Sequence, residues 1–163
     1  MALYQCRPVG CEFLSQAPLR AAVSLHADVD AGRLFEILAA AAATPKWALP
    51  ITQARWLSPA PFGIGSRRVI TFAGRLVGHE RYIAWEPGRR LAYSLETTNV
   101  PGIEALAEEY RIIPSSGGGC ELSWTLAVGM RGRLGVFAVA ARPFIHAALW
   151  RMSRDLVSYA ANP

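Results

Sequence analysis

The sequence lacks an apolar run long enough to cross a membrane. Its longest apolar stretch, residues 134–141, has eight residues, whereas a membrane-spanning helix needs about 20. The amino terminus also lacks the basic residues and following apolar run that mark a secretory signal. These absences predict a cytoplasmic protein without stable membrane insertion.

Cysteine and histidine are scarce, with three residues of each kind. Cys6, Cys11 and Cys120 are an odd number without the spacing of a zinc site, which is typical of proteins in a reducing compartment. The three histidines lie far apart in the sequence, and none belongs to a His-x-His pair. No metal site is therefore predicted.

The glycine-rich stretches do not match a nucleotide-binding loop. The Gly-x-Gly of residues 63–65 leads into an expected strand rather than a helix, and no Lys-Ser or Lys-Thr follows residues 117–119. The Gly-x-Ser-x-Gly motif of serine hydrolases is also missing. We therefore expect no cofactor, and the motifs identify no catalytic residue.

Positive charge comes almost entirely from arginine, because Lys46 is the one lysine beside sixteen arginines. The net charge is +5 and the isoelectric point is about 9.6. Basic proteins often bind nucleic acid, but these arginines are scattered and form only short doublets such as Arg67-Arg68. We interpret them as a solvated basic surface and expect no nucleic-acid partner.

Length and hydropathy indicate one domain with a substantial core. The chain has 163 residues, of which 52% are hydrophobic, and its mean hydropathy is +0.21. Residues 1–17 show no clear period, so we interpret them as an N-terminal extension. Residues 18–163 are expected to form the domain.

The order of expected elements indicates an α+β fold. A strand over 19–27 precedes a helix capped by Asp28 or Asp30, and Thr44-Pro45 is expected to stop that helix. Turn signals then separate short strands, which favours antiparallel hairpins. A helical stripe spans about 133–160, where Pro143 predicts a kink. The strands after the helix are expected at 51–58, 66–74, 75–85, 89–98, 104–114 and 120–128.

Several local segments resemble the START-like (SRPBCC) helix-grip superfamily, and in particular its polyketide cyclase/dehydrase-type members. The resemblance covers about residues 18–160. It rests on an opening strand, turn and helix, on a glycine-led hairpin with a Pro-containing turn, and on a late hairpin turned by proline and small residues. The segments that carry it are "VSLHADVDAGRLFEIL", "TPKWALPITQARWL", "IGSRRVITFAGRLVGHERYIAWEPGRRLAYSL" and "YRIIPSSGGGCELSWTL".

The resemblance implies a helix-grip (Bet v 1-like) fold, in which a curved antiparallel sheet of about seven strands wraps around a long C-terminal helix. A cavity lies between sheet and helix. Members of the superfamily bind lipids, sterols, polyketides or plant hormones, and some catalyse cyclisation or dehydration in that cavity. The superfamily shares no catalytic residue set, so the resemblance assigns no catalytic residue here.

The strand over 75–85 has an unusual alternation. His79 and Arg81 share a face with Ile83 and Trp85 if the strand is regular. We expect this face to line the cavity together with Glu108, because buried ionisable groups need pairing or water. Alternatively, Arg81 reaches water at the sheet edge, Glu108 pairs structurally with an arginine, or a bulge turns the charged set outward.

Nine residues are the expected ligand contacts. Aromatic residues would supply apolar walls, although ordinary core packing explains the tryptophans equally well. Phe144 and Trp150 of the last helix are expected to be lid or core residues, like Phe137. The nine expected contacts are His79, Arg81, Tyr93, Glu108, Tyr110, Trp47, Trp85, Trp124 and Phe137.

Three functions fit this sequence. The first is binding or transport of a hydrophobic small molecule such as a lipid or polyketide. The second is a cyclase or dehydratase in which His79 or Glu108 moves protons. The third is a protein-interaction module with an exposed apolar patch. The oligomeric state stays open, with a homodimer as one alternative.

Overall fold

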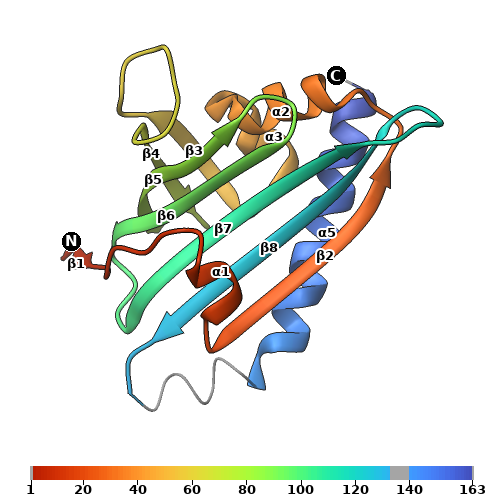
Figure 1. Ribbon diagram of the computed structural model, residues 1–163. Helices are drawn as coiled ribbons and strands as arrows, with labels where there is room; N and C mark the ends of the chain where they lie inside the picture. Colours follow the sequence, from red (N-terminus) through yellow and green to blue (C-terminus); the bar gives the residue numbers. More distant parts are fainter. Residues whose placement is uncertain (1, 133–139, 163) are drawn as a thin grey trace.

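The computed structural model describes residues 2–132 and 140–162, and it contains one curved sheet with all helices but the first on its concave side (Figure 1). Helices are α1 (Phe13–Gln16), α2 (Ala31–Ala39), the 3₁₀ turn η1 (Ala41–Ala43), α3 (Thr44–Trp47) and α5 (Arg142–Ala161). Strands are β1 (Tyr4–Gln5), β2 (Leu19–Ala27), β3 (Ile51–Trp56), β4 (Arg67–Phe72), β5 (Leu76–Glu86), β6 (Arg90–Thr98), β7 (Ile103–Pro114) and β8 (Cys120–Met130).

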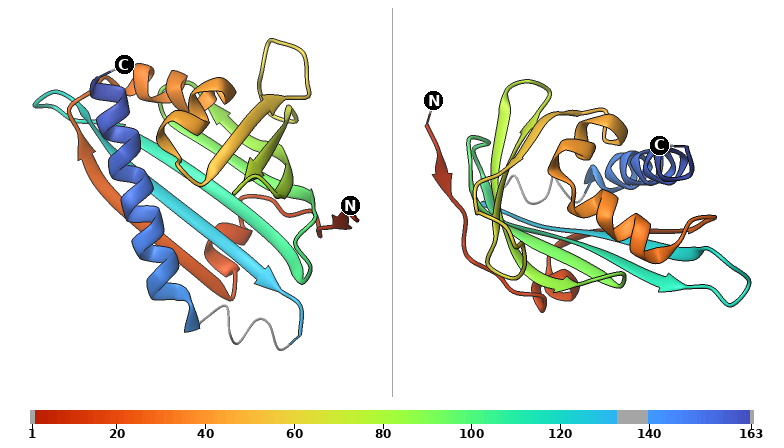
Figure 2. Two further views of the ribbon diagram at one scale, coloured as in Figure 1. Left: turned by 180° about the vertical axis from the view of Figure 1, so that it is seen from behind. Right: turned by 90° about the horizontal axis from the view of Figure 1, so that it is seen from above.

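The sheet is antiparallel throughout, with the strand order β2-β8-β7-β6-β5-β4-β3. These seven strands follow the expected ones closely, and the short β1 adds to them by pairing with β6. The sheet curls so that β3 and β4 turn toward α5, which lies along the concave side (Figure 2). The predicted curved sheet and long terminal helix are thus confirmed.

Local sequence accounts for the helix positions. Asp30 is the N-cap of α2, where its Oδ1 accepts hydrogen bonds from the backbone N–H of Gly32 at 2.8 Å and of Arg33 at 3.2 Å. On α5, Leu149 and Leu156 of the predicted stripe are buried against the core. The predicted apolar faces therefore position both helices against the sheet.

Two expectations about proline are wrong. Thr44-Pro45 does not simply stop a helix, because both residues open the short helix α3. Pro143 does not kink α5, because the helix begins at Arg142 and Pro143 occupies its first turn; residues 133–139, over which the same helix was expected to run, lie outside the described residues. Proline is tolerated at a helix start because the first N–H groups have no intrahelical acceptor.

A β-bulge in β5 overturns the expected orientation of His79 and Arg81. The pairing of β5 with β6 shifts between Tyr82 and Ala84, so Ile83 is an extra residue. Trp85 faces inward as expected, but because of the extra residue the residues before Ile83 point to the opposite face from the one expected. His79 instead lies on the outer face, where its Nδ1 is hydrogen-bonded to Thr97 Oγ1 at 2.8 Å. The alternative that a bulge turns the charged residues outward is therefore correct.

The N-terminal segment runs along the convex side of the sheet (Figure 1). The backbone N–H of Cys6 donates to the Glu96 carbonyl at 2.9 Å. Phe13 and Leu14 of α1 pack on a patch of small residues that α5 does not reach. Residues before the predicted domain therefore cover part of the outer face.

No helix in the described ranges has the length and apolar character needed to span a membrane.

Candidate functional site

A two-part cavity lies between the concave face of the sheet, α3 and α5. The inner chamber has a volume of about 90 Å³, and the outer chamber has about 260 Å³. Ile70, Phe72, Glu108, Trp124 and Met152 line both chambers, so the two chambers are adjacent. The predicted cavity between sheet and C-terminal helix is present.

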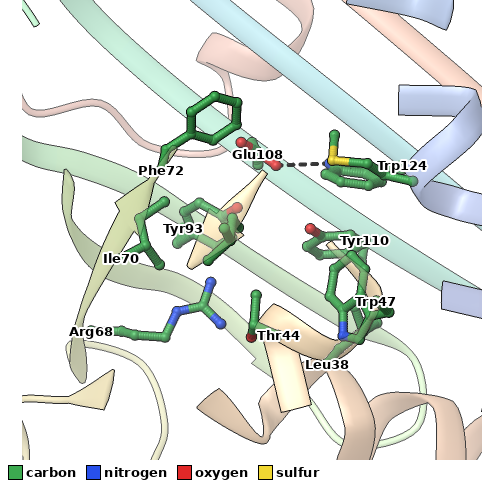
Figure 3. Close-up of a pocket in the computed structure, with 12 residues that line it drawn as sticks. Leu38, Thr44, Trp47, Arg68, Ile70, Phe72, Tyr93, Glu108, Tyr110 and Trp124 are labelled. Carbon is green, nitrogen blue, oxygen red and sulfur yellow. Dashed lines mark hydrogen bonds between the residues drawn. The ribbon is translucent and has the colours of Figure 1, made fainter. Parts of the chain in front are cut away.

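The two chambers differ in chemistry. Aliphatic residues from β5 to β8 and α5 dominate the outer chamber, with Glu80 and Thr98 as its other polar members besides Glu108. The inner chamber collects polar side chains, which Figure 3 shows converging from β4, β6, β7 and α3. The remaining inner lining is Leu38, Thr44, Trp47, Ile51, Arg68, Tyr93 and Tyr110.

A buried ion pair joins β4 to β5 at this site. Arg68 Nε donates to Glu80 Oε2 at 2.7 Å, and their side chains are 5% and 1% exposed. Burial raises the pKa of the Glu80 carboxyl, and the Arg68 guanidinium opposes that shift. The guanidinium carbon also lies 5.3 Å from the centre of the Tyr93 ring. The ion pair and the Tyr93 ring therefore hold the positively charged guanidinium of Arg68 in the cavity wall.

Glu108 is the second carboxyl of the site, and it lies on β7 facing the cavity. Its Oε2 accepts a hydrogen bond from Trp124 Nε1 at 2.8 Å. Burial raises the pKa of Glu108 to about 7, with a further contribution from the negative charge of Glu80. Hydrogen bonds from Tyr93 and Trp124 oppose the increase. Glu108 therefore exchanges its proton near neutral pH.

Two tyrosines complete the polar wall. Tyr93 and Tyr110 are about 5% exposed, and burial raises the pKa of both phenols well above their usual value. They consequently remain neutral hydrogen-bond donors at physiological pH. Figure 3 shows both side chains beside Glu108.

Two buried polar groups of the inner chamber have no partner among the described residues. They are Thr44 Oγ1 and Trp47 Nε1, in side chains that are 2% and 3% exposed. Leaving such groups unpaired is unfavourable by about 1–3 kcal/mol each. Both residues line the inner chamber, so a small movement of their side chains would let a water or a ligand oxygen in the chamber satisfy these groups.

The structure brings together five of the nine expected contacts. These five line the cavity: Trp47, Tyr93, Glu108, Tyr110 and Trp124. Trp85 instead packs in an aromatic cluster with Phe35, at 5.5 Å between ring centroids. Phe137 lies outside the described residues.

His79 and Arg81 are not in the cavity, contrary to the expectation. Arg81 lines a groove on the outer face, together with Pro8 of the N-terminal segment. Arg81 is therefore not the arginine that could pair with Glu108, because the sheet separates the two side chains. Phe144 and Trp150 are 79% and 46% exposed, so they are neither lid nor core.

Sequence reasoning missed Arg68 and Glu80. A signal was present, since Arg68 shares one face of β4 with Ile70 and Phe72, and this face lines the inner chamber. Glu80 shares a face of β5 with Tyr82 in the same way. Arg68 and Glu80 were both expected to face solvent, because charged residues are usually exposed.

The assembled site suits hydrogen bonding and proton transfer. Arg68 and the two phenols are donors, whereas Glu108 donates when protonated and accepts when ionised. Within the parts of the chain that the structure describes, no three His, Cys, Asp or Glu side chains gather into a metal-binding cluster.

Solved structures share the fold at low sequence identity. The Zhui aromatase/cyclase of Streptomyces sp. R1128 aligns with a TM-score of 0.64 and 20% identity, over 87% of this chain and 93% of that one. A START superfamily protein of Mycobacterium smegmatis gives 0.64 and 15%, over 83% and 95%. Ginseng major latex-like protein 151 of Panax ginseng gives 0.69 and 9%, over 86% and 96%. These alignments confirm the helix-grip fold.

Sequence comparisons are more specific. Uncharacterized proteins of Mycobacterium bovis and Mycobacterium tuberculosis are 37% identical over 159 residues, which is 96% of this chain and 93% of theirs. A family model described as "Polyketide cyclase / dehydrase and lipid transport" matches residues 18–161. The resemblance found in the sequence is thus confirmed, and the chain belongs to the polyketide cyclase/dehydrase and lipid transport family.

Proposed function

We propose that the protein binds a hydrophobic small molecule that carries a hydrogen-bonding oxygen. The apolar body of the ligand would occupy the outer chamber, and its oxygen would enter the inner chamber. The observation that carries this proposal is the adjacency of the two chambers, which share five lining residues: one chamber is mainly aliphatic, and the other is lined by Arg68, Tyr93, Glu108 and Tyr110. Family membership supports a hydrophobic ligand.

The two chambers would make different contributions to binding. Burial of apolar ligand surface contributes roughly 25 cal/mol per Å², so the outer chamber would supply most of the affinity. Polar contacts contribute less, about 0.5–1.5 kcal/mol each, but they distinguish oxygenated molecules from hydrocarbons. Tyr93, Tyr110, Trp47 and Arg68 would donate to the oxygen, and Glu108 would accept or donate.

A matched pair of probes tests this proposal. Equilibrium dialysis against 2-naphthol and naphthalene compares two bodies of the same shape that differ in one oxygen. We expect saturable binding of both and a three- to tenfold lower Kd for 2-naphthol, which corresponds to one net hydrogen bond. Failure of both probes to bind, with the protein folded, would contradict a ligand cavity.

Variants test whether the preference for 2-naphthol over naphthalene arises in this cavity. Glu108→Leu is expected to retain naphthalene binding and to lose most of the preference for 2-naphthol. Arg81→Leu is the matched control, because this strand residue faces the outer groove. Equal preference in wild type and Glu108→Leu would remove Glu108 from the ligand site.

A second candidate function is acid–base catalysis in the same cavity. It is favoured by the pKa of Glu108, which at about 7 suits a group that both takes and gives a proton at neutral pH. The substrate would bear a carbonyl group whose adjacent carbon loses a proton to Glu108. Arg68 would stabilise the negative oxygen that develops.

Kinetics separate catalysis from binding. On a carbonyl substrate that the protein turns over, Glu108→Gln should lower kcat by 10²-fold or more and change KM little. His79→Gln is the control, because His79 lies outside the cavity. Full turnover by Glu108→Gln would exclude this role. Native mass spectrometry that finds a retained hydrophobic compound would favour a carrier.

A further inference from the structure

One end of the sheet surrounds the outer chamber. The β4–β5 turn, the β6–β7 turn and the end of β8 meet there. The Asn99 side chain donates to the Arg75 carbonyl at 2.8 Å, and the Arg131 N–H donates to the Gly102 carbonyl at 2.8 Å. The first turn of α5 lies at this same end (Figures 1 and 2). Val100 and Ile103 from the β6–β7 region line the outer chamber.

Apolar side chains are exposed at this end. Phe72 and Leu76 flank the β4–β5 turn, line the outer chamber and are 39% and 41% exposed. Phe144 in the first turn of α5 is 79% exposed. Burying such side chains on a partner is favourable, and a soluble monomer usually covers them.

Arginines accompany these apolar residues. Arg75, Arg131 and Arg142 are exposed, and none forms an ion pair with a described carboxylate. The described carboxylates nearby are Glu104, which Arg7 pairs at 3.1 Å, and Glu12 on the outer-face helix α1. We define the mouth surface as Phe72, Arg75, Leu76, Arg131, Arg142 and Phe144.

The opposite end of the sheet carries charges of both signs, with carboxylates in excess. Strands β2 and β5 end there, and β8 begins there. The carboxylates at that end are Asp28, Asp30, Glu36, Glu86 and Glu121, and the arginines are Arg33, Arg89 and Arg90. This modest excess of negative charge, opposite the unpaired arginines of the mouth surface, favours an orientation with the mouth surface toward an anionic partner.

We propose that the mouth surface docks on an anionic lipid bilayer. Its arginines would approach lipid phosphates while Phe72, Leu76 and Phe144 enter the interface, and the acidic end would face away from the bilayer. This contact would be peripheral, with the apolar side chains entering only the headgroup region. Docking would place the opening of the outer chamber against the membrane.

Charge and apolar surface together favour a bilayer over nucleic acid. Duplex DNA would attract the arginines but offers no apolar phase for three exposed side chains. A bilayer with anionic headgroups attracts both kinds of residue. The proposal requires no occupant of the cavity, so it stands or fails independently of the ligand function.

Vesicle sedimentation tests the docking. We expect the protein to bind vesicles of phosphatidylcholine and phosphatidylglycerol, to bind pure phosphatidylcholine weakly and to be released by 1 M salt. Each arginine near an anionic surface contributes roughly fivefold to partitioning, so Arg75→Ser/Arg131→Ser/Arg142→Ser should bind roughly a hundredfold more weakly. Phe144→Ser should reduce binding without changing its salt dependence.

A double variant provides the matched control. Arg55→Ser/Arg89→Ser removes exposed arginines that lie away from the mouth surface, and it should retain most of the vesicle binding. All these positions are exposed, so folding should survive, and thermal unfolding verifies it.

Three outcomes would overturn the proposal. They are absence of binding to anionic vesicles, equal losses in the two arginine variants, and equal binding to charged and neutral vesicles. Binding to duplex DNA that needs the mouth arginines, with no vesicle binding, would identify a nucleic-acid surface instead.

Discussion

Trp124 and Glu108 are hydrogen-bonded across the strand pair β7–β8, with 2.8 Å between the indole nitrogen and the carboxyl oxygen. The indole N–H stabilises the ionised carboxylate, but burial has the larger effect and raises the pKa of Glu108 to about 7. This hydrogen bond therefore links the position of the Trp124 ring in the cavity wall to the protonation state of Glu108.

The first prediction concerns the pH dependence of stability. Unfolding returns Glu108 to its ordinary pKa of 4.5, whereas the folded state titrates near 7. Between these values the folded protein holds a proton that the unfolded chain has lost, so the free energy of unfolding falls as pH rises. The decrease due to Glu108 is at most about 3 kcal/mol, and it ends above the folded pKa.

Urea unfolding of wild type and Glu108→Gln isolates this contribution. The stability of Glu108→Gln relative to wild type should rise between pH 4.5 and 7 and stay constant above that range. Parallel stability curves for the two proteins would show that Glu108 has an ordinary pKa.

The second prediction concerns the buried ion pair. Arg68→Met leaves the Glu80 carboxyl buried without its cation, and Glu80→Met leaves the Arg68 guanidinium alone. Each should destabilise by about 3–5 kcal/mol, whereas Arg68→Met/Glu80→Met should be much less destabilised than the sum. Denaturant unfolding measures this double-mutant cycle, and additive effects would contradict direct coupling.

The third prediction concerns orientation along β5. His79→Ala and Arg81→Ala should leave the Kd for 2-naphthol within about twofold, because neither side chain reaches the cavity. Gly78 does face it, and a β-carbon there would lie 2.9 Å from Leu95 Cδ1. Gly78→Val should therefore weaken naphthol binding. Equilibrium dialysis that ranks these variants in the opposite order would indicate a different register.

The fourth prediction concerns the unpartnered hydroxyl of Thr44. Thr44→Val removes a buried oxygen without a protein acceptor and preserves the shape of the side chain. Stability should stay constant or rise by up to about 1 kcal/mol. Asp30→Ala, which removes the α2 cap, should destabilise by about 1 kcal/mol. Thermal unfolding compares them, and a large loss in Thr44→Val would point to an ordered water on that hydroxyl.

The fold was predictable because its signals are local. Alternation and turn residues placed the strand 19–27 at the ends that β2 has, and Asp30 was one of two predicted caps. The wrong proline assignments have a similar cause, since proline either ends or begins a helix and the tertiary context decides.

The site was only partly predictable, because one inserted residue changes the face of every residue before it. Glu108, Tyr93 and Tyr110 were placed correctly, because the register shifts of β6 and β7 fall near Glu96 and Glu104 and leave the stretches with these three residues regular. Ile83 sits in the bulge, so His79 and Arg81 were assigned to the wrong face. No residue in "RYIAW" marks a bulge as a glycine would, and only the pairing with β6 reveals it.

Carbon-13 NMR of the labelled glutamate carboxyls tests the central claim most directly, with Glu108→Gln identifying the Glu108 resonance. Our account predicts a midpoint near pH 7 and a saturable shift of this resonance on addition of 2-naphthol, with no response to 2-naphthol from Glu121, which does not line the cavity. A Glu108 midpoint near 4.5 that 2-naphthol leaves unchanged would contradict it.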